Sequence, residues 1–239
     1  MVRAGATEFR WRHSEGVARN GGSRSRSARN QSGVCKLNLA PSIPPPPPPW
    51  PVSPVHYIWT AGSTLHRIYA PARCGATALG FRTAGPFVRF DHHEVGHRRG
   101  ILYAAESLDG ALVEVAGDRG ICSYSSLRYT SFAPTRDLLL LDLTSAGVRQ
   151  AGMLAKVTSC DHGDSQKWAR YCYDNAGLYG EIDGFYYPNA HNFYIAVALF
   201  ERAQNALPLH PAFDRKLGNA AHREELLAAG PSTNTLLIR

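Results

Sequence analysis

Four side chains of this sequence are of types that bind charged ligands and stabilise developing charge. Glu114 follows Tyr103 by eleven residues, and Arg67 and Arg89 precede both. A carboxylate can stabilise a positive charge as it develops, and a guanidinium can bind a phosphate group through two parallel hydrogen bonds. An aromatic ring can stack on a planar ligand, or orient it through a hydroxyl group. Together, these residue types suit a site for an anionic ligand.

Glu114 stands out because of the helix that is predicted over 107–117. Leu108, Ala111, Leu112 and Val115 recur at helical spacing, so we expect one face of this helix to point into a core. Glu114 lies beside this apolar stripe. A carboxylate at the edge of a core is costly unless it faces water, a partner or a ligand.

The other elements place these residues in a mixed α+β domain, with a mostly β core and short helices. Alternating and continuous apolar runs predict strands over 65–70, 86–90, 100–105, 121–130, 137–143, 182–187 and 193–200. The run IAVALF is typical of a central strand that is covered on both faces. Further helices are predicted over 146–156, 164–175 and 222–229, with Asp164 and Ser165 as N-caps of the second of these.

The positive charge of the chain is concentrated in its first residues. The net charge is +7, and residues 1–50 hold eight of the 26 basic and two of the 19 acidic side chains. That segment therefore carries +6 and the rest of the chain +1. A nearly neutral folded part argues against direct nucleic-acid binding by the folded domain.

Composition divides the chain into an extension, 1–56, and a folded domain, 57–239. Residues 1–40 are rich in Gly, Ser, Arg and Asn without periodicity, which predicts disorder. Residues 41–54 hold nine of the sixteen prolines, which favours an extended spacer, or a ligand for an SH3-like or WW-like partner. An upstream sequence included by a wrong start codon is the other interpretation of this extension.

Cysteine usage and hydropathy indicate a cytoplasmic protein. Five scattered cysteines without a CxxC pair argue against a disulfide framework and for a reducing compartment. They are expected to be buried small side chains rather than nucleophiles. Neither a signal peptide nor an apolar run of membrane-spanning length is visible, so no membrane partner is expected.

Three motifs occur in a fixed order: LHRIY (65–69), FVRFDHH (87–93) and GILYAAESLDGALVEV (100–115). Together they resemble the RES-domain family, the toxin partners of bacterial toxin–antitoxin pairs. LLLLDLT (138–144), SQKWAR (165–170) and EIDGFYYPN (181–189) fall where that family has its later motifs, so the resemblance covers about residues 64–203.

The resemblance implies an ADP-ribosyltransferase-like fold and an enzyme that degrades NAD by hydrolysis or phosphorolysis. NAD would be a substrate, phosphate a possible co-substrate, and no other cofactor and no metal would be needed. It also implies a protein antitoxin of Xre-like type as partner. A homodimer is common among such domains.

The family's functional residues map onto this chain one by one. The resemblance makes Glu114 the carboxylate that stabilises the cation-like ribose, Arg67 and Arg89 the phosphate ligands, and Tyr103 the contact to the ring or ribose. Where the family usually has a Ser after its late strand, this chain has Asn189. Asparagine can still donate and accept hydrogen bonds, so it could bind NAD there.

Other interpretations stay open at this stage. Singly, Glu114 could be a solvated surface group, Arg67 a strand-edge ion pair, Arg89 a surface charge, Tyr103 a core residue and Asn189 a turn residue. The domain could transfer ADP-ribose to a macromolecule, or be an inactive RES-like binding module.

The histidine-rich stretch DHHEVGH offers a separate alternative. His92, His93 and His97 could suggest a metal site. However, Gly96 and Gly100 make a steady helix improbable, so a polar loop is favoured over a ligand face on a helix.

Overall fold

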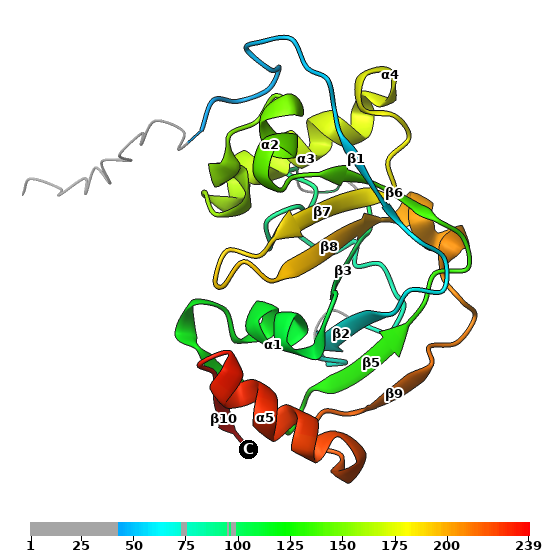
Figure 1. Ribbon diagram of the computed structural model, residues 1–239, viewed down its shortest axis with the longest axis vertical. Coiled ribbons are helices and arrows are strands. Elements are labelled where there is room, and N and C mark those ends of the chain that lie inside the picture. Colours follow the sequence, from blue (N-terminus) through cyan, green and yellow to red (C-terminus); the bar gives the residue numbers. More distant parts are fainter. Residues whose placement is uncertain (1–42, 73–75, 95, 97–98) are drawn as a thin grey trace, which may run out of the picture. The chain divides into compact units, whose positions relative to one another are not determined.

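The computed structural model describes residues 43–72, 76–94, 96 and 99–239 (Figure 1). The predicted disordered segment 1–40 therefore lies outside the described residues. The strands are β1 His56–Trp59, β2 Leu65–Tyr69, β3 Ile101–Ala105, β4 Ile121–Ser123, β5 Arg128–Phe132, β6 Leu138–Asp142, β7 Gly184–Pro188, β8 Ile195–Phe200, β9 Phe213–Lys216 and β10 Leu236–Ile238. The α-helices are α1 Leu108–Ala116, α2 Ser145–Gln150, α3 His162–Asp174, α4 Ala176–Tyr179 and α5 Arg223–Ser232. Short 3-10 helices cover Gly117–Arg119, Ala155–Thr158, Glu201–Ala206 and Ala220–His222.

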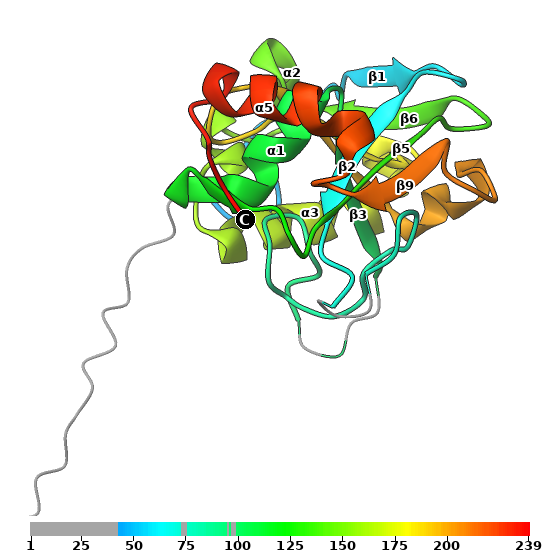
Figure 2. The same ribbon diagram turned by 90° about the horizontal axis from the view of Figure 1, so that it is seen from below.

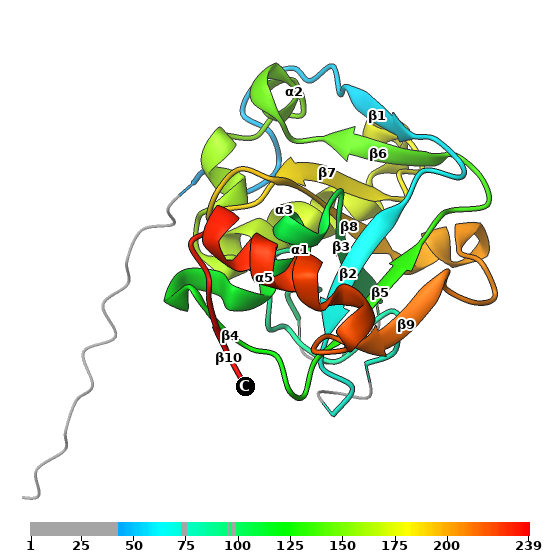
Figure 3. The ribbon, with the colours of Figure 1, turned by 60° about the horizontal axis from the view of Figure 1, so that its bottom comes forward.

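Eight strands form one twisted sheet in the order β1-β6-β7-β8-β3-β2-β5-β9 (Figure 3). The pair β6–β7 is parallel and the remaining pairs of this sheet are antiparallel. β4 and β10 form a separate parallel pair. A mostly antiparallel sheet with short helices confirms the predicted mixed α+β class.

The strand β8 lies in the middle of the sheet, as its apolar sequence predicts. It pairs with β7 on one side and β3 on the other. Its residues from Ala196 to Phe200 are all buried, because side chains from both faces of the sheet enter core clusters. This strand pairs with β3 along its whole length, with Tyr103 opposite Ala198.

The sheet is weakest between β2 and β3. These two strands share a single residue pair, His66 with Ala105, whereas β2 and β5 are paired over five residues. Beyond this pair the two strands diverge, and the sheet separates into two halves (Figure 1). The gap between the halves lies next to α1.

Helix α1 begins and ends where the sequence predicts. Ser107 is its N-cap and accepts a hydrogen bond from the Gly110 amide at 3.1 Å, and Gly117, with a φ of +55°, ends it. The predicted core face is partly wrong, because Val115 is 37% exposed while Val113 is buried. The helix packs against both β2 and α5 (Figure 2), which shifts its buried face.

Helix α3 begins earlier than predicted. Its N-cap is Asp161, whose carboxylate accepts a hydrogen bond from the Gly163 amide at 2.8 Å. Asp164 and Ser165 are instead buried residues of the first turns. Asp164 and Ser165 are of residue types that often cap helices, but they are buried inside the helix, and Asp161 caps it instead.

Three predicted features of the strands differ in the structure. Residues 86–90 form no strand, because the Phe87 and Val88 amides donate to the Asp91 carboxylate rather than to a neighbouring strand. The predicted strand 121–130 is divided by a turn into β4 and β5, and the short strands β1, β9 and β10 were not predicted.

The composition of the proline-rich segment predicts an extended spacer, and its described part packs on the domain. Ile43 is 2% exposed within a core cluster, and Trp168 donates to the Pro44 carbonyl oxygen at 2.9 Å. The Trp50 indole donates to the Arg149 carbonyl oxygen, and the Arg149 guanidinium lies 3.5 Å from the centre of the Trp50 ring. Aromatic and apolar side chains among the prolines give this segment its contacts.

Candidate active site

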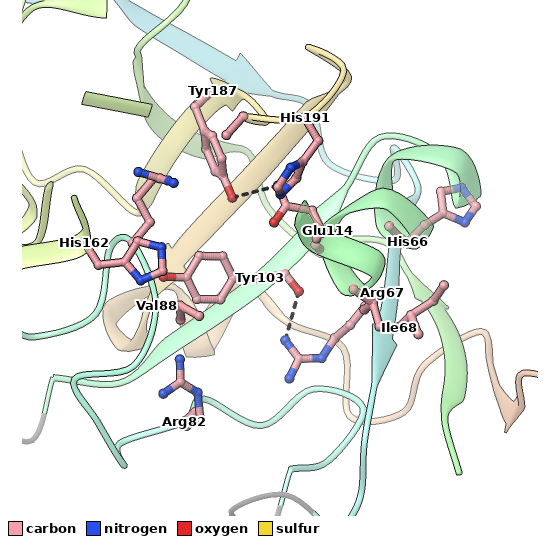
Figure 4. Close-up of a pocket in the computed structure, with 16 residues that line it drawn as sticks. His66, Arg67, Ile68, Arg82, Val88, Tyr103, Glu114, His162, Tyr187 and His191 are labelled. Atoms are coloured by element: carbon pink, nitrogen blue, oxygen red, sulfur yellow. Dashed lines mark hydrogen bonds between the residues drawn. The ribbon is translucent and has the colours of Figure 1, made fainter. Parts of the chain in front are cut away.

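A cavity of about 400 Å³ opens beside the gap between β2 and β3 (Figure 4). Its walls come from these two strands, from α1, from the loop before β3 and from the loop between β7 and β8. Four predicted site residues line it, namely Arg67, Arg89, Tyr103 and Glu114. The volume lies in the range of about 300–1,000 Å³ that is usual for small-molecule sites.

Glu114 projects from the last turns of α1 into this cavity. The Tyr187 hydroxyl donates a hydrogen bond to its Oε1 at 3.4 Å (Figure 4). Burial raises the pKa of Glu114 to about 7, although the positive charge of Arg89 and the hydrogen bond from Tyr187 both act to lower it. The carboxylate therefore changes its charge near neutral pH, as functional carboxylates often do.

Arg67 points from β2 across the gap in the sheet. It is 8% exposed, and its Nη1 donates to the Tyr103 carbonyl oxygen at 2.9 Å. Burial lowers the pKa of Arg67 to about 10, so the side chain stays charged at neutral pH. Its Nε has no hydrogen-bond partner among the described residues. A charged guanidinium that lines a cavity suits an anionic ligand.

Arg89 reaches the cavity from the loop before β3. Its Nη1 donates to the Cys160 carbonyl oxygen at 2.6 Å, and its charge acts on Glu114. Arg82, which was not predicted, also lines the cavity and forms a bidentate ion pair with Asp91. Three guanidinium groups thus border one cavity.

Tyr103 lines the cavity, but its hydroxyl already has protein partners. It accepts a hydrogen bond from the Phe90 amide at 2.9 Å and donates to Asp91 at 3.4 Å. Burial raises the pKa of Tyr103 well above 10, so this hydroxyl stays protonated. The Tyr103 ring is therefore the part of this side chain that could contact a ligand, because the hydroxyl binds the loop that carries Arg89.

Asn189 does not belong to the lining of the cavity. It is fully buried, and its Oδ1 accepts hydrogen bonds from the amides of His191 and Asn192 at 2.9 and 3.0 Å. This is the turn role that its sequence context also allowed. Asn189 shapes the loop from which Ala190 and His191 reach the cavity.

Sequence reasoning missed four further lining residues whose side chains can form hydrogen bonds: His66, His162, Tyr187 and His191. Tyr187 contacts the central carboxylate, and His162 lies at the start of α3 (Figure 4). The sequence around Tyr187 contains many tyrosines. Tyr186 and Tyr187 point to opposite faces of β7, and the sequence does not show which face borders the cavity. His191 follows a turn whose direction no local pattern reveals.

The other candidate groups stay apart from this cavity. The His92 ring bonds to the carbonyl groups of Glu94 and Thr83, and the segment around it is a loop, as predicted. His97 lies outside the described residues. The part of the chain that the structure describes contains no group of three His, Cys, Asp or Glu side chains that could hold a metal ion.

The described cysteines are Cys122, Cys160 and Cys172, and all three are buried free thiols. This confirms the expectation for them, whereas Cys35 and Cys74 lie outside the described residues. Among the described residues, no helix has the length and apolar character needed to cross a membrane.

The fold and the site define an α+β domain with one carboxylate in an arginine-lined cavity, and comparison with known proteins gives its family. The family model of the RES domain matches residues 56–218. This is well over half of the chain, which therefore belongs to the RES domain family. The match covers all four predicted residues that line the cavity.

Among solved structures, the chain is similar to a chain in the crystal structure of the M. tuberculosis MbcT–MbcA toxin–antitoxin complex. The two chains share 19% sequence identity over 73% of this chain and 92% of that chain, with a TM-score of 0.44. A search of curated proteins found no match.

Proposed function

We propose that this RES-domain protein cleaves the bond between nicotinamide and ribose in NAD. The observation that carries the proposal is Glu114, a carboxylate with a pKa raised to about 7 in a cavity that three arginines border. Cleavage of this bond builds positive charge on the ribose, next to the negative charges of two phosphates. The cavity offers one group for the first charge and several for the second.

In the proposed reaction the bond from ribose C1′ to the nicotinamide nitrogen breaks. Its electron pair moves to the positively charged ring, which leaves as neutral nicotinamide. The ionised Glu114 stabilises the cation-like ribose, and the Tyr187 hydroxyl holds that carboxylate in place. An oxygen of water or phosphate then bonds to C1′, and water gives up one proton to the solvent.

The phosphates would bind to guanidinium groups. Arg67 uses its Nη1 for the Tyr103 carbonyl group, and Arg89 uses one nitrogen for the Cys160 carbonyl group, which leaves further donors of each guanidinium for a ligand. Arg82 is committed to Asp91 and would contribute charge at longer range. The ring of Tyr103 offers a flat surface for the nicotinamide.

We further propose that the protein is the toxin of a toxin–antitoxin pair, restrained by a protein antitoxin. Membership of the RES family supports this proposal, because family members are toxin partners of such pairs. A protein that drains NAD also needs restraint in its own cell. Co-expression would test it: growth arrest on expression of the toxin alone, and rescue by the product of a neighbouring small gene, are the expected results.

The experiment for the activity follows nicotinamide release from NAD by the purified full chain, with and without phosphate. The variant Glu114→Gln removes the charge at nearly constant shape, and Glu181→Gln, at an exposed glutamate, is the matched control. We expect release by the wild type and the control, and its loss in Glu114→Gln. Absence of release from the wild type under both conditions would refute the proposal and favour a binding module.

The products identify the acceptor. NAD that carries its label in the adenosine half gives free ADP-ribose after hydrolysis and a phosphorylated ADP-ribose after phosphorolysis. Label that stays on a macromolecule would instead show ADP-ribosyl transfer.

A further inference from the structure

The loop from Arg82 to Asp91, here the 82–91 loop, carries Arg89 to the cavity. Its first residue is tied to the sheet, because the backbone of Arg82 exchanges two hydrogen bonds with that of Ile101, at 2.8 and 3.0 Å. Its two end residues are tied to each other by the bidentate pair of Arg82 and Asp91, with N–O distances of 2.7 and 2.9 Å. The loop is thus closed by side chains at its base.

Asp91 is the centre of this arrangement. Asp91 is 1% exposed, so protein groups rather than water must stabilise its negative charge. Besides Arg82, its Oδ2 accepts the amides of Phe87 and Val88 at 2.8 and 3.1 Å, and its Oδ1 accepts the Tyr103 hydroxyl at 3.4 Å. The carboxylate at the end of the loop therefore binds the first residue of the loop, two amides in its middle and a side chain of strand β3.

The backbone on either side of Arg89 is also held. The Val88 carbonyl accepts Gln166 Nε2 at 2.9 Å, and the Phe90 amide donates to the Tyr103 hydroxyl. Arg99 Nη2 donates to the carbonyl oxygens of Phe90 and Asp91 at 2.9 and 2.7 Å. The peptide groups around Arg89 are fixed, and its side chain is directed to the cavity.

We propose that Asp91 is a positioning residue that holds the Arg89 guanidinium at the cavity, where it binds the negatively charged part of the substrate. The inference rests on the proposed function for the identity of that substrate. Asp91 itself does not line the cavity; it acts through Arg89. Asparagine at position 91 could not replace these contacts, because only one of the two end atoms of its side chain accepts hydrogen bonds, whereas both oxygens of Asp91 do so.

The first test is a double-mutant cycle of Asp91→Asn and Arg89→Gln, with NAD as substrate, at about pH 8.5, where Glu114 is ionised. Asp91→Asn is expected to raise KM about tenfold or more and to change kcat by less than about threefold. In the Arg89→Gln background the same change should leave KM nearly unaltered. Effects on KM that multiply in the double variant would overturn the proposal.

Asp183 supplies a matched control. It too is buried, forms a bidentate pair with Arg136 at 2.7 and 2.8 Å and accepts the Leu139 amide at 2.9 Å, but it does not line the cavity. Asp183→Asn therefore reports what loss of a buried carboxylate does to the fold. We expect it to lower stability and to leave KM unchanged, whereas an equal rise in KM would overturn the special role of Asp91.

A second readout needs no ligand. The pH dependence of the stability difference between Glu114 and Glu114→Gln reports the pKa of Glu114, which the charge of Arg89 lowers. Asp91→Asn and Arg89→Gln should both move its midpoint to higher pH, and Asp183→Asn should not. An unmoved midpoint would overturn the positioning role, whereas a moved midpoint without NAD cleavage by the wild type would overturn the proposed function alone.

If Asp91→Asn does not fold, Gly85→Ala makes the same test. Gly85 has a φ of +156°, which alanine rarely adopts, and a Cβ atom there would lie 2.8 Å from Asp91 Oδ2. The substitution therefore displaces the backbone of the 82–91 loop, the Asp91 carboxylate or both, while the charge of Asp91 is kept. The same rise in KM and the same shift of the midpoint are expected, and neither change occurring would overturn the proposal.

Discussion

Replacing Glu114 by Gln should stabilise the protein, and more so as the pH rises. The pKa of Glu114 is raised from 4.5 to about 7 in the folded protein, mainly by burial. The folded chain therefore holds this proton more tightly than the unfolded chain does. The stability that the protonated carboxyl gives is fully present below about pH 4.5 and is lost as the pH rises through about 7.

The magnitude follows from the two pKa values. Each tenfold difference in proton affinity corresponds to about 1.4 kcal/mol, so ionised Glu114 costs the folded state about 3 kcal/mol. Glutamine has no charge to desolvate and can still accept the hydrogen bond from Tyr187. The variant should match the wild type near pH 4.5 and exceed its free energy of unfolding by about 3 kcal/mol above about pH 8.

Urea unfolding at a series of pH values, followed by tryptophan fluorescence, measures this difference. The exposed Glu181→Gln controls for the loss of one negative charge and should give a small, nearly pH-independent difference. By thermal unfolding, the expected gain at high pH is roughly 6–12 °C for a chain of this size. A difference for Glu114→Gln that stays constant with pH would refute the argument that this carboxylate is desolvated.

Three further predictions concern activity and the loop. The value of kcat/KM for NAD cleavage should rise with pH through about 7, because Glu114 must be ionised, and a pH profile without this limb would contradict its role. Arg67→Gln should raise KM for NAD by about 10- to 100-fold, since it removes a charged donor worth about 1.5–3 kcal/mol, and steady-state kinetics would measure this. Tyr103→Phe leaves the Phe90 amide without its acceptor, so urea unfolding should show a loss of about 1–3 kcal/mol.

Much of the scaffold could be predicted because it is encoded locally. The apolar run of β8 marked a central strand, and Ser107 and Gly117 marked the ends of α1. These signals depend on residues that are near in sequence. The same signals failed at 86–90, because the Phe87 and Val88 amides bind the Asp91 carboxylate, which Arg82 and Tyr103 hold in place.

The candidate site could be predicted only through the order of its motifs. Arg67, Arg89, Tyr103 and Glu114 do meet at one cavity, as their order indicated. The residues that complete it were out of reach, because Tyr187 and His191 arrive from a part of the chain more than 70 residues from Glu114. Asn189 precedes the lining residues Ala190 and His191, but its own side chain binds the amides of the turn and does not line the cavity.

The single residue pair between β2 and β3 has a consequence for ligand binding. Arg67 belongs to one half of the sheet, while Arg89 and Tyr187 are attached to the other. A dinucleotide that bound to residues of both halves would link β2 to β3. Hydrogen–deuterium exchange along these two strands would then slow. Part of the binding free energy would then go into holding the two halves of the sheet together. A substitution that strengthens the β2–β3 contact without touching the cavity would therefore raise the affinity for the dinucleotide.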